Sequence, residues 1–505
     1  MTENSNEKNS LIRGLGLLAA ISIIVGNVVG TGVFLKARVM TCNVGTPGWV
    51  LAAWIAAGVL SLAGALTYAE LSAMKPETGG EYVFLRDAYG RVWSFLYGWM
   101  QIFIAKTGSQ ASIAVAFAIF LNDFLGGQLK QTILHTNIFG SDYELTSLQI
   151  VAVMMIVIIT TINCASVVLS GQLATYFTFI KIALILLVGF GAFFLGGGSF
   201  AHFGMANTGG ACEGVADSVR YGVAGTTFAA GFGAAMLGAL WGYDGWNNLT
   251  LIAGEVKNPQ RNIPIALIGG TILIILLYVF VNVAYFYVLD PTQVASVSKD
   301  SSVAREVAIR FLGAGALVLM TAGLMASSVG TLHTSILTGA RVPFAMARDG
   351  VMFKAMGKLS EGTRVPVIAL LVQGIWACIL CLSGSFDTLT DYVIFGSWIF
   401  YALVTTSVFV FRRKYPNAER PYKAFGYPVV PILFLIGAGL LLYNTVKADY
   451  YQILKKISLT SGNYVLEQIF IIVTAPSISG ILLILLGLPV YYYLTNRIAK
   501  NTGEE

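Results

Sequence analysis

The chain has 505 residues, of which 56% are hydrophobic and only 11% are charged, and its mean hydropathy is +0.75. Soluble domains carry roughly 25% charged residues, so the composition excludes a soluble protein and indicates one that crosses a membrane many times. The net charge of +6 comes from Lys and Arg that are spread along the links between apolar segments, and it therefore does not indicate nucleic-acid binding.

Twelve apolar runs of about 20 residues predict an all-α membrane protein with 12 transmembrane helices in a single membrane domain at about residues 11–496. Residues 1–10 are predicted to be a disordered cytoplasmic tail and residues 497–505 a second cytoplasmic tail. The helices are expected to begin near Ile12, Trp49, Trp93, Leu148, Gly171, Phe228, Ile263, Ala308, Pro366, Leu389, Val429 and Ala475.

The distribution of Lys and Arg predicts the orientation. When the N-terminus is placed in the cytoplasm, the inner links hold roughly twice as many of these residues as the outer links. Both termini are therefore expected in the cytoplasm, in agreement with an even number of spans. The first apolar run is not a cleavable signal peptide, because it is too long and no small-residue cleavage site follows it.

Two spans are interrupted by glycine at mid-length. Residues 26–32 read GNVVGTG inside the first span, and residues 238–247 read GALWGYDGWN inside the sixth. A span normally satisfies its backbone hydrogen bonds internally, so a break is tolerated where it lines a protein cavity. A matched pair of breaks in two halves of a chain indicates the binding site of a transporter built from inverted repeats.

The breaks predict a site for a zwitterion. Free N–H groups at Gly30, Thr31 and Gly32 would bind a carboxylate, and the carbonyls of Val28 and Trp241 would accept hydrogen bonds from an ammonium. An α-amino acid is the commonest small zwitterion. The alternative for either glycine motif alone is close packing between membrane helices.

Three ionisable residues lie within the predicted spans, and such residues are functional candidates by default. Lys181, in the fifth span, is too central to reach the interface, and beside the first break it would take the place of a sodium ion. Lys106, in the third span, is less central. Asp244, within the second break, either caps a half-helix or faces the substrate side chain, where it would favour cationic or polar amino acids. Trp241 is predicted to lie over bound substrate as a gate.

The remaining reactive residues indicate neither an enzyme nor a metal site. The three histidines, His135, His202 and His333, are far apart, and the five cysteines lack metal spacing. Cys42 and Cys212 both lie on the predicted outer side, and the sequence leaves open whether they form a disulfide. No catalytic residue, cofactor or metal is therefore predicted.

Five further motifs complete a resemblance that covers nearly the whole chain. The sequence is similar to the amino acid–polyamine–organocation (APC) superfamily and, within it, to the L-type amino acid transporter (LAT) family. Besides the first break, the resemblance rests on YAEL at 68–71, PETGGEY at 76–82, GEVKNPQRNIP at 254–264, ARDG at 347–350 and LGLPVYYY at 486–493.

The resemblance implies a five-plus-five inverted repeat of the leucine-transporter type, with repeats at about 11–197 and 226–412 and helices 11 and 12 at about 427–496. It implies sodium-independent, alternating-access exchange of L-amino acids across the plasma membrane. In residue terms it assigns substrate contacts to Val28, Gly30, Thr31, Gly32, Trp241, Asp244 and Asn247, gating to Trp241 and coupling of binding to closure to Lys181.

Two departures refine this expectation. Animal members join a glycoprotein heavy chain through a cysteine between spans three and four, and residues 122–146 contain no cysteine. A stand-alone transporter of a bacterial inner membrane is therefore expected, with amino acids and the lipid bilayer as its partners. The segment 447–468 is longer than is usual in the family. A proton-coupled amino acid or polyamine symporter or uniporter is the alternative function, and an amino acid sensor is a more distant one.

Overall fold

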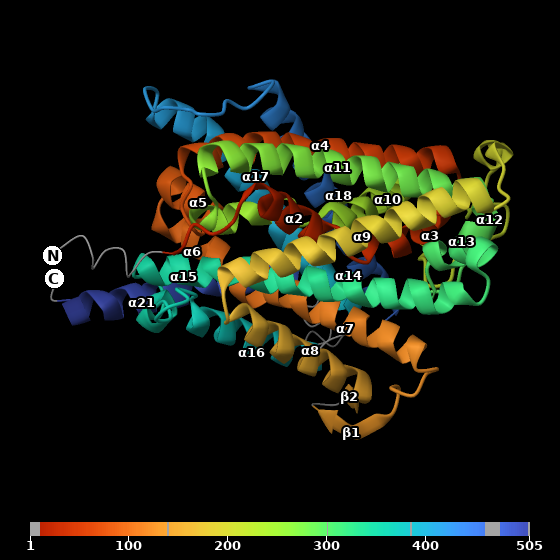
Figure 1. Cartoon of the computed structure of the whole chain (residues 1–505), viewed down its shortest axis with the longest axis horizontal. Helices are drawn as coiled ribbons and strands as arrows, with labels where there is room; N and C mark the ends of the chain where they lie inside the picture. The colour runs from red at the N-terminus through yellow and green to blue at the C-terminus, as the bar shows by residue number, and fades with distance from the viewer. Residues whose placement is uncertain (1–10, 139–140, 300, 384–385, 460–474, 503–505) are drawn as a thin grey trace.

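The computed structural model describes residues 11–138, 141–299, 301–383, 386–459 and 475–502. Helices account for most of these residues (Figure 1). The α-helices are α2 (Leu17–Val28), α3 (Gly32–Val44), α4 (Pro47–Met74), α5 (Glu81–Tyr89), α6 (Arg91–Met100), α7 (Lys106–Phe124), α8 (Ser147–Asn163), α9 (Val167–Leu195), α10 (Phe228–Tyr243), α11 (Pro259–Val288), α12 (Pro291–Ala295), α13 (Val303–Leu312), α14 (Gly315–Gly339), α15 (Arg341–Arg348), α16 (Val367–Ser383), α17 (Phe386–Lys414), α18 (Val429–Leu459), α20 (Pro476–Leu485) and α21 (Gly487–Thr502).

Shorter helical turns join or extend these helices. A π-helical turn, η1 (Gln101–Ala105), connects α6 to α7, and a 3-10 helix, η4 (Asn248–Glu255), follows α10. Three further 3-10 turns lie in the links: η2 (Phe200–Gly204), η3 (Asp217–Val219) and η5 (Lys354–Gly357).

Nine helical stretches among the described residues are long and apolar enough to cross a membrane. Two shorter apolar helices, Ser147–Asn163 and Val367–Leu382, accompany them, and the broken pair α10 and η4 lies between two of the nine. The structure is thus that of a multi-pass membrane protein, while the number of twelve spans and the cytoplasmic termini stay predictions.

The two glycine-rich interruptions lie where the sequence places them. α2 ends at Val28 because Val29 leaves the helical region (φ −74°, ψ 84°), and the N–H of Gly30 turns back onto the carbonyl of Val28 at 2.8 Å. α10 ends at Tyr243, since Asp244 is extended (ψ 140°) and Gly245 has φ +100°, a conformation that favours glycine.

The start of the eighth span is corrected, and the structure adds three features that the sequence did not specify. The eighth span was expected near Ala308, but Gly313, with φ +56°, ends α13 and α14 starts at Gly315. The chain is not purely helical, because β1 (Thr132–Ile138) and β2 (Ser141–Thr146) form an antiparallel hairpin in which Thr136 pairs with Tyr143. The long link at 447–468 is helical as far as Leu459, and the rest of that link lies outside the described residues. Helix α21 continues through the predicted C-terminal tail to Thr502.

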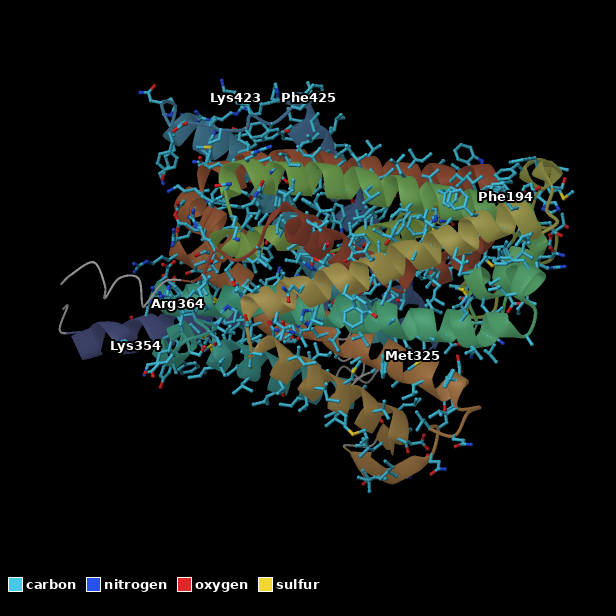
Figure 2. The ribbon with its side chains drawn as sticks, in the orientation of Figure 1. Phe194, Met325, Lys354, Arg364, Lys423 and Phe425 are labelled. Atoms are coloured by element: carbon cyan, nitrogen blue, oxygen red, sulfur yellow. A yellow bond between two sulfur atoms is a disulfide. The ribbon has the colours of Figure 1, made fainter. Side chains whose placement is uncertain are left out.

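The two ends of the bundle differ. Figure 1 shows α5, α6, α15 and α21 at one end, here called the α15 end, and α12 and α13 at the other; the β-hairpin projects below the bundle between its middle and this second end, which is here called the hairpin end. Lys354 and Arg364, both placed inside by the sequence, lie at the α15 end, and Phe194 lies at the opposite end (Figure 2). A disulfide between Cys42 and Cys212 joins the last turn of α3 to the link that precedes α10.

Ion pairs and backbone contacts close the α15 end. Buried Arg341 forms two hydrogen bonds with Glu255, at 2.7 and 2.9 Å, and the N–H of Leu15 donates to the Glu255 carbonyl at 3.0 Å. Arg86 binds Asp349 at 2.8 Å. Burial lowers the pKa of the Arg86 guanidinium, but hydrogen bonds and charges from Asp349 and Asp87 outweigh it, so that this pKa is raised.

Candidate functional site

A cavity lies between the two breaks. Its empty volume is about 640 Å³, including open solvent at its mouth. The lining residues from α2, η1 and α14 are buried, whereas Thr31 of the first break, Ser109 and Ile113 of α7, and Trp241 are partly exposed, so the cavity opens toward the hairpin end, where α7 runs. It is lined by Asn27, Val28, Gly30, Thr31, Gly32, Gln101, Ala105, Lys106, Ser109, Ile113, Trp241, Gly242, Asp244, Gly245, Asn248, Thr331, Ser335, Ser397 and Tyr401.

The first break presents free N–H groups to this cavity. In the described part of the chain, no acceptor is found for the backbone N–H groups of Thr31, Gly32 and Val33, which start α3. Together with the helix dipole, such groups form a site for an anion such as a carboxylate. The N–H of Gly30, in contrast, is already occupied by the Val28 carbonyl.

Carbonyl oxygens surround the same place. The Val28 carbonyl accepts from Gly30 and also from the Tyr278 hydroxyl at 3.0 Å, so both of its lone pairs are occupied in this conformation. The Trp241 carbonyl accepts one bond, from the N–H of Asp244 at 3.2 Å. No described donor reaches the carbonyl of Asn27, which makes it a third acceptor for an ammonium, one that the sequence did not single out.

Glycine has different roles at two positions of the first break. A Cβ atom on Gly32 would lie 3.0 Å from the Cα of Gly242, so the two broken helices approach closely there. A Cβ on Gly30 would meet only Thr331, at an ordinary 3.6 Å. Gly32 therefore serves helix packing as well as backbone access, which is the alternative that the sequence left open.

Lys181 is fully buried beside the cavity without lining it. Its ammonium donates to the Gly26 carbonyl at 2.6 Å and to the Thr331 hydroxyl at 2.7 Å. The charge on α9 thus joins the carbonyl end of α2 to α14. Thr331 itself lines the cavity, so a change at the substrate position has a short route to Lys181.

A second buried lysine lies on the opposite side of the break. The ammonium of Lys106 donates to the side-chain oxygen of Asn248, and the amide of Asn248 donates to the side-chain oxygen of Asn27 at 3.0 Å. This chain of contacts links α7, η4 and α2. The sequence gave Lys106 less weight than Lys181, yet Lys106 is the lysine that lines the cavity.

Asp244 and Asn247 have separate surroundings. Asp244 ends α10 through its backbone N–H, while its carboxylate lines the cavity and accepts from the Tyr401 hydroxyl at 2.9 Å; no side chain caps the start of η4 in the described structure. Asn247 is buried outside the cavity lining and donates to Glu81, which also accepts from the Tyr97 hydroxyl at 2.6 Å. Trp241 is partly exposed at the cavity wall, as a gate would be.

Six of the substrate-contact residues predicted from the sequence line one cavity, and Asn247 and Lys181 lie just behind its wall. The polar residues that sequence reasoning missed, among them Asn27, Gln101, Asn248 and Tyr401, come from four separate elements. A polar residue within an apolar span was the available signal for Gln101 and Asn27. Among the described residues, no group of three or more His, Cys, Asp or Glu is arranged to hold a metal ion.

Comparison with known proteins decides the family. A family model described as amino acid permease matches residues 15–487. The chain belongs to the amino acid permease family. This family of the APC superfamily consists of transporters, so the protein is a transporter and not an enzyme, as the sequence predicted.

Curated amino acid permeases cover most of the chain. The serine/threonine exchanger SteT of Bacillus subtilis is 30% identical over 98% of this chain and 99% of its own length. The human b(0,+)-type amino acid transporter 1 is 30% identical over 88% of this chain and 85% of its own length. The large neutral amino acids transporter small subunit 2 of rat is 29% identical over 84% of this chain and 75% of its own length. These relatives agree with the resemblance to the LAT family.

Proposed function

We propose that this permease exchanges L-amino acids across the plasma membrane by alternating access, without sodium. The observation that carries the proposal is the pairing of free N–H groups at Thr31 and Gly32 with carbonyl acceptors at Asn27 and Trp241 in one cavity. A carboxylate and an ammonium that are one carbon apart match such a site. The activities of the relatives, amino acid exchange and transport, support the same substrate class.

Several of the predicted site residues have distinct roles in this exchange. The start of α3 binds the α-carboxylate, the carbonyls near the two breaks bind the α-amino group, and Trp241 covers the substrate. Lys181 couples binding to closure through Gly26 and Thr331. Val28 becomes an acceptor for the substrate only when the Tyr278 hydroxyl releases its carbonyl.

The absence of a sodium requirement rests on Lys181. In transporters with broken helices, unwound backbone carbonyls coordinate the coupling cation. Here a fixed ammonium already occupies the Gly26 carbonyl and bridges it to α14. An ammonium in this place supplies the attraction between α2 and α14 that a bound cation would supply.

The first experiment is uptake of radiolabelled amino acids into proteoliposomes that contain the purified chain alone. Vesicles are preloaded with a mixture of the twenty amino acids or left empty, without sodium and without a pH gradient. We expect uptake only into loaded vesicles, and competition by unlabelled amino acids then identifies the substrates. Because no heavy chain is present, the same result supports a stand-alone transporter.

Two results would contradict the proposal. Uptake into empty vesicles that rises with an imposed proton gradient would replace exchange by proton coupling, the alternative function, and would make Lys181 a proton-coupling residue. Exchange that appears only after sodium is added would remove the proposed role of the Lys181 charge.

A further inference from the structure

The cavity holds one positive and one negative side chain that do not neutralise each other by direct contact. Lys106, from α7, and Asp244, from the second break, are the charged residues of its lining. No ion pair joins them within the part of the chain described by the structure. Lys106 binds Asn248, and Asp244 binds Tyr401. Opposite charges that line one cavity attract each other without direct contact.

The other polar groups near the cavity do not add a further charge to its lining. Lys106 and Asp244 are therefore the charged side chains that a substrate would contact. Glu81 also lies near Lys106, but it is behind the cavity wall, and its oxygens accept from Tyr97 and Asn247. Gln101 lines the cavity with 2% of its surface exposed, and its side-chain oxygen has no partner in the described structure. An unpartnered buried acceptor is costly unless a ligand supplies a donor.

The backbone of the first break is occupied by the α-amino and α-carboxylate groups in the proposed function, on which the present inference rests. The side chain of the substrate then extends into the remaining space, where Lys106, Asp244 and Gln101 lie. An acidic side chain would meet Asp244, and a cationic side chain would meet Lys106. A hydroxyl or carboxamide offers both a donor and an acceptor and carries no net charge.

We propose that Lys106 is a specificity-determining residue that counterbalances Asp244, so that the permease selects amino acids with uncharged polar side chains and rejects cationic ones. Asp244 alone would attract a basic side chain, which is the preference that the sequence considered for it. The ammonium of Lys106 cancels this attraction because both charges lie in one poorly hydrated cavity, where Coulomb interactions are strong.

The test measures arginine and serine exchange in proteoliposomes by the wild type and by Lys106→Gln. We expect the arginine-to-serine ratio to rise at least about tenfold in Lys106→Gln, since one charge is removed close to the substrate side chain. Lys106→Arg keeps the charge and should keep the low ratio. Lys354→Gln, an equal change of charge at an exposed position of the α15 end (Figure 2), is the matched control and should leave the ratio unchanged.

Asp244→Asn keeps the inference testable if Lys106→Gln does not fold, and a double variant tests whether the two residues act together. Asp244→Asn leaves Lys106 uncompensated and should raise glutamate exchange relative to serine. The double variant Lys106→Gln/Asp244→Asn should lose the gain in arginine exchange. A wild type that exchanges arginine as well as serine, or a Lys106→Gln variant whose ratio is unchanged, would overturn the inference.

Two different measurements test the proposed function and the role of Lys106. Serine exchange by the wild type tests whether the chain is an amino acid exchanger at all, and only the ratios test Lys106. If the wild type prefers glutamate and Lys106→Gln abolishes that preference, Lys106 is instead a direct ligand of an acidic side chain, and charge balance is excluded.

Discussion

Lys181 connects three helices through two short hydrogen bonds, and neither partner is a carboxylate. Its ammonium holds the Gly26 carbonyl of α2 and the Thr331 hydroxyl of α14 from its own position on α9. A buried ammonium that is satisfied only by neutral acceptors depends on the positions of these helices. Movement of α2 during the transport cycle must therefore change the energy of this charge.

We expect Lys181→Met, which keeps an unbranched side chain that is one atom shorter and removes its charge, to slow exchange about tenfold or more while the substrate dissociation constant changes by less than about threefold. Hydrogen bonds to charged groups contribute about 1.5–3 kcal/mol, and this energy is lost on closure rather than on binding. Exchange kinetics and equilibrium binding on the same preparation measure the two effects. Equal weakening of both would instead make Lys181 a direct ligand.

Gly30 and Gly32 offer a matched pair of substitutions within one motif. Gly32→Ala places a methyl group 3.0 Å from the Gly242 Cα and must push the broken helices apart, whereas Gly30→Ala makes an ordinary contact with Thr331. Overpacking costs about 1–3 kcal/mol, so we expect Gly32→Ala to reduce kcat/KM roughly 5- to 150-fold.

Gly30→Ala should remain within a few-fold of the wild type, and Gly30→Val, which extends further into the cavity, should abolish binding. Exchange assays on the three variants test the order of severity. Equal damage from Gly30→Ala and Gly32→Ala would mean that substrate access, and not helix packing, requires both glycines.

Tyr278, a residue of a third helix, connects the two broken helices to each other. The Tyr278 hydroxyl of α11 lies 3.0 Å from the Val28 carbonyl and 2.9 Å from the Gly242 carbonyl, and its ring packs 5.1 Å from both Trp54 and Tyr243. The hydroxyl therefore holds the carbonyl ends of both half-helices in one orientation.

Tyr278→Phe removes the hydroxyl and leaves the ring contacts, so the protein should remain folded. We expect KM to rise about 2- to 10-fold, because one buried hydrogen bond contributes about 0.5–1.5 kcal/mol and the two breaks lose their shared donor. Exchange kinetics with a thermal unfolding control measure this. A lower KM would instead show that the hydroxyl competes with the substrate for the Val28 carbonyl.

Local sequence signals predict some of these elements and not others. Glycine in an apolar run predicts a break because it exposes backbone, and both breaks are present. The β-hairpin of residues 132–146 is short and mixed in polarity, so hydrophobic periodicity did not reveal it. The contacts of Lys106, Asn248 and Asn27 join residues from three spans, and no local pattern predicts which of those spans become neighbours.

The orientation of the whole molecule follows from two independent features. Lys354 and Arg364 belong to the predicted inner links, which hold more Lys and Arg than the outer ones, and both lie at the α15 end (Figure 2); the positive-inside rule therefore predicts that this end faces the cytoplasm. The Cys42–Cys212 disulfide lies at the C-terminal end of α3, away from the first break. Disulfides persist in oxidising compartments outside the cytoplasm. Both features predict that the mouth of the cavity faces the outer side in this conformation.

This orientation is tested by labelling cysteines with a membrane-impermeant maleimide in a variant that lacks Cys164, Cys378 and Cys381. In right-side-out vesicles, we expect labelling of a variant that also carries Lys299→Cys, because this position after α12 at the hairpin end is exposed. A second variant that also carries Lys354→Cys provides the matched control, and this exposed position should react only in inside-out vesicles. The opposite pattern would invert the topology, and the cavity described here would then face the cytoplasm.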